Sequence, residues 1–248
     1  MGDFTLILGE NYERRSRDAR GVVVNSYFYE WHAAGGGRAL EVAVDAVEAF
    51  SDFFGPFPYT ELDVTETPND LGGMEYSGLV VVEDGLYPGV STVEWLTAHE
   101  VAQHWWMVVV GNDQIDELWL DKALTQYSTM LHCEAVYGED RANAILNTIF
   151  VQTRQGLERA GRDMPAGLPV DAFPRHLHFD IGYDKGALYV HNLRKRVGRG
   201  GRGFPGAGIS ARYNTAQARI STQQLSAGGW VHSSSGQPSG SESYWQPW

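Results

Sequence analysis

The composition of the chain changes abruptly after Gly198, and this break limits how much of the 248-residue sequence can form a packed core. In residues 199–248, Gly, Ser, Gln and Pro occupy 26 of the 50 positions, whereas Leu, Ile, Val and Met occupy four. So little apolar surface cannot offset the conformational entropy that is lost on ordering. We therefore expect one folded unit within residues 1–198, followed by a disordered, low-complexity Gly/Ser/Gln-rich tail.

The charge of the chain divides at the same point. The formal net charge of −12 at pH 7 combines −15 over residues 1–198 with +3 over residues 199–248. An acidic folded unit argues against a nucleic-acid partner, because nucleic acids bind basic surfaces. Apolar runs such as 108–110 are too short to span a membrane, no signal peptide is visible, and a lone cysteine, Cys133, excludes a disulfide framework. The default compartment is therefore cytoplasmic, and nothing in the sequence indicates an oligomeric state.

Residue patterns divide the folded unit into a β-rich start and a largely helical remainder. Segments 4–8 and 21–29 are predicted strands separated by a long turn over 10–20, and 33–37 is predicted to be a glycine-rich linker. This hairpin is either the end of a sheet whose other strands are missing or a pair that docks on the remainder of the folded unit. Further strands are predicted over 62–67 and 78–82, and helices over 40–54, 91–110, 118–138, 139–161 and 183–197.

His99 and Glu100 lie inside one of these predicted helices and begin an incomplete zinc-peptidase pattern. In the HExxH pattern, two imidazoles four residues apart share one helix face and one metal, and the glutamate acts on the attacking water. Here position 103 is Gln, and the next histidine is His104. Positions 99 and 104 are roughly 140° apart around a regular helix, against roughly 40° for 99 and 103. The two histidines can therefore share a metal only if a π-bulge realigns them.

The sequence around this pair closely resembles the M1 family of gluzincin zinc aminopeptidases. A Trp-Trp pair follows at 105–106, and the stretch 119–127 (WLDKALTQY) is similar to the family's WLxEG region. Upstream, 72–76 (GGMEY) is similar to the exopeptidase motif GxMEN, with Tyr in place of Asn. Downstream, 183–186 (YDKG) is similar to the catalytic-tyrosine motif. The motifs stand in the family's order, and the resemblance covers residues 38–198.

The resemblance implies an α/β (α+β) fold, a thermolysin-like peptidase domain with a small mixed sheet packed on helices. It divides the chain into a β-hairpin remnant of a preceding sandwich domain with its linker over 1–36, an M1-like catalytic domain over 37–198, and the tail over 199–248. Further helices would follow residue 198 in the family. The tail is therefore either an extension with a function of its own or the translation of a shifted reading frame, and we favour the second.

The resemblance also implies roles for individual residues. His99 would be the first zinc ligand and Glu100 the general base. Glu75 would bind the substrate's free α-amine, with Gly72, Gly73 and Met74 beside the peptide. Tyr183 would stabilise the oxyanion.

The other two ligand positions of the family, Gln103 and Lys122, depart from its pattern. Gln is a weak neutral ligand for zinc. Lys122 would direct an ammonium at a dication, with roughly 4 kcal/mol of repulsion per unit charge at ~4 Å and an effective dielectric of ~20. We therefore expect zinc, the cofactor of the family, to bind very weakly or not at all. Lys122 could instead pair with Glu100 or Glu75.

Three functions are compatible with these residues. A working zinc aminopeptidase would use a distorted site of His99, His104 and either Asp121 or Glu117. A non-catalytic pseudopeptidase would bind peptide N-termini through Glu75, and the product of a damaged gene would do neither. We expect M1-type hydrolysis of N-terminal residues from peptides, impaired in this copy, with a peptide as substrate or ligand.

Overall fold

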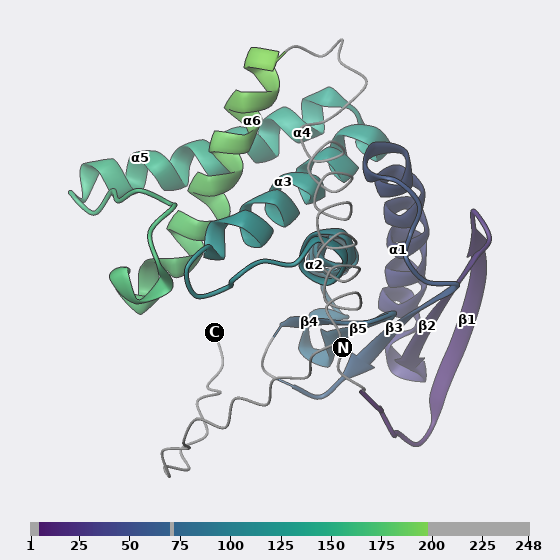
Figure 1. Ribbon diagram of the computed structural model, residues 1–248. Coiled ribbons are helices and arrows are strands. Elements are labelled where there is room, and N and C mark those ends of the chain that lie inside the picture. The colour runs from purple at the N-terminus through teal and green to yellow at the C-terminus, as the bar shows by residue number, and fades with distance from the viewer. Residues whose placement is uncertain (1–4, 70–71, 198–248) are drawn as a thin grey trace, which may run out of the picture.

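A computed structural model describes residues 5–69 and 72–197 of the chain (Figure 1). The predicted tail over 199–248 and its expected disorder lie outside the described residues. Within them, a five-stranded mixed sheet packs against helices, so the expected α/β class is confirmed. None of the described helices is both long and apolar enough to cross a bilayer.

The sheet has the strand order β1-β2-β3-β5-β4. Its strands are β1 (Tyr12–Ala19), β2 (Val22–Tyr29), β3 (Glu61–Thr67), β4 (Gly73–Tyr76) and β5 (Leu79–Glu83). β2, β3 and β5 run parallel to one another, whereas β1 and β4 pair antiparallel at the two edges. The predicted strands over 62–67 and 78–82 are confirmed as β3 and β5. β4 is a further strand, formed by the second glycine of the GGMEY motif and the residues after it.

The N-terminal hairpin belongs to this same sheet, because β2 pairs with β3 from Val23 opposite Glu61 to Tyr27 opposite Thr65. Of the two alternatives, the hairpin is therefore the pair that docks on the remainder of the folded unit. The expected long turn over 10–20 is wrong, since most of it forms β1. The predicted strand over 4–8 is also wrong for its described residues, which are irregular.

The predicted linker over 33–37 is instead the first part of α1 (Ala33–Phe54), which packs on the sheet. Gly35 and Gly36 are buried because neighbouring groups approach the helix too closely for any side chain. A Cβ on Gly36 would lie 2.1 Å from the ring of Phe28, and one on Gly35 would lie 2.5 Å from the carbonyl oxygen of Tyr87. The glycines therefore mark close packing, not flexibility.

The remaining helices confirm most of the predicted segments, and several contain wide π-helical turns. The bounds are α2 (Val90–Gln103) with a π-helical continuation over His104–Val110, α3 (Leu118–Tyr137), α4 (Glu139–Ile145), a π-helical stretch over Leu146–Val151, α5 (Gln152–Arg159), a π-helical stretch over Phe179–Lys185 and α6 (Gly186–Val197). Short 3₁₀ turns occupy Glu30–His32, Asp84–Leu86, Val170–Ala172 and Arg175–Leu177. Figure 1 shows α1 and α2 against the sheet and α3 to α6 beyond them.

We predict that Gly36→Ala lowers the free energy of unfolding by about 2 kcal/mol, because the new methyl group would overlap the Phe28 ring. The matched control is Gly156→Ala in α5, where an added Cβ meets nothing within 4 Å. That change should stabilise the protein by up to ~1 kcal/mol through helix propensity. Urea unfolding followed by circular dichroism measures both, and equal stabilisation by the two changes would contradict this account of α1.

Candidate active site

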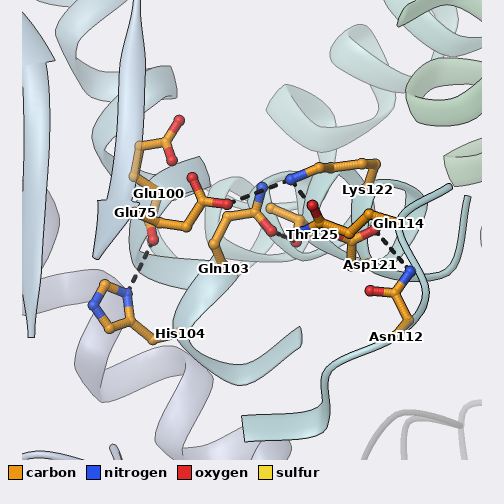
Figure 2. Close-up of polar contacts among 9 residues, drawn as sticks. All are labelled: Glu75, Glu100, Gln103, His104, Asn112, Gln114, Asp121, Lys122 and Thr125. Atoms are coloured by element: carbon orange, nitrogen blue, oxygen red, sulfur yellow. Dashed lines mark hydrogen bonds and ion pairs between the residues drawn. The ribbon is translucent and has the colours of Figure 1, made fainter. Parts of the chain in front are cut away.

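Four elements bring the expected site residues together: α2, α3, the edge strand β4 and the π-helical stretch Phe179–Lys185, which carries Tyr183. α2 carries His99, Glu100 and Gln103, α3 carries Lys122, and β4 carries Glu75. β4 comes close to α2 at Gly73, where a Cβ would lie 2.5 Å from Oε1 of Glu100. Figure 2 shows Glu75, Gln103 and Lys122 converging between these elements.

Lys122 lies at the centre of this group as a cation between two carboxylates. Its Nζ is 3.4 Å from Oε1 of Glu75 and 3.2 Å from Oδ2 of Asp121, and its side chain is 12% exposed. Burial lowers the pKa of Lys122, but the facing Tyr183, Glu75, Asp121 and Glu100 together raise it above its ordinary value. The ammonium is therefore charged at neutral pH. The pairing with Glu75, one of the two expected from the sequence, is confirmed.

The side chain of Gln103 accepts a hydrogen bond inside the protein. Its side chain is buried, and its Oε1 accepts a hydrogen bond from Oγ1 of Thr125 at 3.0 Å. The amide oxygen is the atom through which a glutamine coordinates a metal. In this structure that atom faces α3, so it is already satisfied by a neighbouring hydroxyl.

His99 and Tyr183 face each other at the same site. Their rings stack with centroids 5.9 Å apart and planes 12° apart. Burial, helped by the nearby charge of Lys122, lowers the pKa of His99 to about 4, so the imidazole is neutral at pH 7. Burial raises the pKa of Tyr183 to about 12, so its phenol stays protonated and can donate a hydrogen bond. The structure thus brings His99, Tyr183 and Lys122 together.

Glu100 is buried in a position that disfavours its charged form. Burial, followed by the adjacent carboxylate of Glu75, raises the pKa of Glu100 well above its ordinary value. Its Oε2 has no hydrogen-bond partner among the described residues. A general base must be ionised to accept a proton. The environment of Glu100 therefore works against the role that the family resemblance implies.

His104 points away from this group, which corrects its assignment as a metal ligand. Its ring packs 5.1 Å from Phe57 and 6.2 Å from Tyr59, centroid to centroid. Its Nδ1 lies 3.1 Å from the backbone oxygen of Glu100, one helical turn earlier (Figure 2). A π-helical turn is present, but it begins only at His104. The α-helical spacing from 99 to 103 is unchanged, so the two histidines keep divergent directions.

The residues that face His99 do not fit a zinc ion. Zinc takes imidazole, thiolate or carboxylate ligands in a tetrahedral group. Across the part of the chain that the structure describes, no group of three or more His, Cys, Asp or Glu side chains is placed to hold a metal. Asp121 is bound to Lys122 and to the amides of Asn112 and Gln114, at 3.2 and 3.4 Å, and Glu117 is exposed. Neither completes a ligand set with His99.

A buried polar network beside the site was not expected from the sequence. Asp184 accepts hydrogen bonds from Nε2 of Gln126 at 2.8 Å and from Oγ1 of Thr153 at 3.0 Å. Burial raises the pKa of Asp184 to about 6. Two features of the sequence could have pointed to this network. Asp184 follows Tyr183 in the YDKG motif, and Gln126 lies one turn after Lys122 on α3.

Comparison with known proteins decides the family. The model of the peptidase family M1 domain matches residues 38–204. The chain belongs to peptidase family M1. It is 28% identical to aminopeptidase M1-B of Oryza sativa subsp. japonica over 80% of this chain and 23% of that protein. It is 24% identical to human endoplasmic reticulum aminopeptidase 1 over 63% of this chain and 18% of that protein. The chain thus spans less than a quarter of the length of these M1 relatives.

Solved M1 structures share the fold. The M1 zinc metallopeptidase of Deinococcus radiodurans superposes with a TM-score of 0.63 at 22% identity, over 87% of this chain and 49% of that one. Native yeast LTA4 hydrolase gives a TM-score of 0.61 at 17% identity, over 82% and 33% of the two chains. The curated relatives are named aminopeptidases, and the Deinococcus radiodurans protein is a zinc metallopeptidase. The departures at Gln103 and Lys122 are features of this M1 chain.

We predict that Asp184→Asn removes a pH dependence of stability. The folded-state pKa of about 6 lies above the ordinary value of 3.8, so the native state holds this proton more tightly than the unfolded state. The resulting stability is present below pH 4 and is lost as the pH rises through 6, by at most ~3 kcal/mol. The variant should therefore gain stability relative to the native protein between pH 4 and 7.

Urea unfolding at several pH values measures this difference. The control is Asp171→Asn, at an exposed position of the 3₁₀ turn Val170–Ala172, which should follow the native protein across the range. A constant difference between Asp184→Asn and the native protein from pH 4 to 7 would contradict the prediction.

Proposed function

We propose that this chain is an M1-type domain that binds the free N-terminus of a peptide and in which hydrolysis is impaired. The observation that carries the proposal is the buried ammonium of Lys122, which pairs with Glu75 and Asp121 where the family places its third zinc ligand. A cation at that position repels a metal dication. The peptide-binding side of the site, in contrast, has the groups that a peptide N-terminus needs.

Glu75 and the strand that carries it support peptide binding. The Glu75 side chain is nearly buried, and a carboxylate in such a position binds an ammonium strongly. β4 is an edge strand of the described sheet, and an extended peptide can add its backbone to such an edge. A variant of the Deinococcus radiodurans M1 enzyme, with a TM-score of 0.63 to this chain, has been solved with a Tyr-Ser-Ala substrate. A peptide is therefore the ligand class that we propose.

Impaired hydrolysis follows from the residues on the metal-facing side. Gln103 is bound to Thr125, and Glu100 is held toward its protonated form by burial and by Glu75. Tyr183 retains a protonated phenol that can donate to a peptide carbonyl. The chain can thus position a peptide and polarise its carbonyl weakly, but the residue at the general-base position, Glu100, is held toward its neutral form.

We predict that Gln103→His combined with His104→Gln and Lys122→Glu raises zinc affinity by at least 100-fold over the native chain. The triple change restores a second imidazole one turn from His99 and replaces the repelling ammonium with a carboxylate. Isothermal titration with zinc chloride measures the affinity. The matched control is the double change without Lys122→Glu, which should bind more weakly than the triple variant. A native chain that binds close to one zinc ion per molecule tightly and hydrolyses peptides would contradict the proposed impairment.

We also predict that the native chain binds the tripeptide Tyr-Ser-Ala at least tenfold more tightly than its N-acetylated form, because acetylation removes the α-ammonium that pairs with Glu75. Glu75→Gln should abolish this difference, since an amide cannot compensate the charge. Glu158→Gln, at a surface position of α5, is the control and should preserve it. Equal affinities for the two peptides in the native chain would contradict N-terminal recognition.

A further inference from the structure

We propose that Lys122 is a built-in competitor for the peptide N-terminus, so that a peptide binds Glu75 only by displacing the Lys122 ammonium toward Asp121. This inference rests on the proposed function and adds how access to the site is controlled. A lysine ε-ammonium and a peptide α-ammonium are the same chemical group, each with positive charge and three N–H donors. One carboxylate oxygen of Glu75 already faces the lysine at 3.4 Å.

Asp121 gives the displaced ammonium a second partner. Its Oδ2 is 3.2 Å from Nζ of Lys122, slightly closer than the Glu75 oxygen. Asp121 is itself held by the side-chain amides of Asn112 and Gln114, so its carboxylate is fixed in place (Figure 2). A buried charge that loses its partner costs several kcal/mol. Because Asp121 remains beside it, Lys122 can release Glu75 without becoming an unpaired buried cation.

Glu100 supplies an independent sign that this place accepts a ligand. Its side chain is 4% exposed, and its Oε2 has no hydrogen-bond partner among the described residues. Buried polar atoms in native proteins are usually satisfied. The carboxyl group of Glu100 is close enough to that of Glu75 for the two to affect each other's charge, so an ammonium that enters next to Glu75 would meet a second carboxyl group. Oε2 of Glu100 can therefore accept a hydrogen bond that Lys122 does not donate.

The decisive comparison is between Lys122→Met and Lys122→Arg. The methionine fills a similar volume without a charge, so the Lys122→Met variant should bind Tyr-Ser-Ala at least tenfold more tightly than the native chain does. The arginine keeps a cation at the position, so the Lys122→Arg variant should bind the peptide no more tightly than the native chain does. Isothermal titration measures these affinities, with the N-acetylated tripeptide as the negative control for each protein.

A second measurement uses the native chain and does not depend on how well a variant folds. The sequence contains three lysines, Lys122, Lys185 and Lys195, so labelling with ¹⁵N-lysine gives three side-chain signals. Lys185 is bound to Asp163 and the backbone of Met164, away from Glu75. Addition of Tyr-Ser-Ala should shift the signal of Lys122 while the other two stay in place, and the N-acetylated form should shift none.

The outcomes separate this inference from the proposed function. If the native chain discriminates the two peptides but Lys122→Met binds no more tightly, or the Lys122 signal does not move, competition by Lys122 is overturned and peptide binding stands. If only Lys122→Met binds the free peptide, the competitor is upheld and binding by the native chain is overturned. If neither protein binds it, both are overturned.

Discussion

Burial of several carboxylates at one point is the constraint on which the site of this protein depends. Glu75, Glu100 and Asp121 come from β4, α2 and α3, and each is less than a tenth exposed. Ionised carboxylates removed from water are strongly destabilising unless a cation or hydrogen bonds compensate them. Lys122 compensates two of them, and protonation relieves the third. The packing of β4 against the helices therefore requires a positive charge at this position.

The same charge determines what the site can do. An ammonium on a flexible side chain can exchange one carboxylate for another, whereas a metal ion held by three protein ligands stays in place and activates water. A site compensated by lysine is thus suited to binding a second ammonium and poorly suited to hydrolysis. This separates the two halves of the M1 pattern in this chain. Gly72, Met74 and Glu75 agree with it on the peptide side, where only Tyr76 departs, and Gln103 and Lys122 depart from it on the metal side.

Much of the fold could be predicted from local sequence, and the errors have physical causes. α3 and β5 have regular apolar patterns with clear ends, and both form as predicted. The glycines in the first turns of α1 predicted a linker, because sequence alone does not show that Phe28 and Tyr87 pack against them. β1 is mostly polar and exposed at the sheet edge, so it lacks the apolar alternation that marks a half-buried strand.

Prediction of the site divides in the same way. The family motifs brought Glu75 and Lys122 together although 47 positions separate them, and the opposite charges then predicted their pairing. The direction of His104 could not be settled, because it depends on where a π-helical turn begins, and the turn begins at His104 itself. The network of Asp184 was not predicted, because Gln126 and Thr153 come from different helices and only the places of Asp184 and Gln126 within two separate motifs pointed to it.

Gly73 shows why the peptide-facing side can keep its form without a metal. A Cβ at this position would lie 2.5 Å from Oε1 of Glu100, so any larger residue would require the Glu100 side chain to shift. That contact joins the backbone of β4 to one side chain of α2, Glu100, and includes none of the residues at the family's zinc-ligand positions. The placement of Glu75 therefore follows from packing between β4 and α2. The contact between Gly73 and Glu100 includes neither Gln103 nor Lys122, and the peptide side needs only a cation beside Glu75, so recognition of an ammonium can persist where the ligand set for zinc does not.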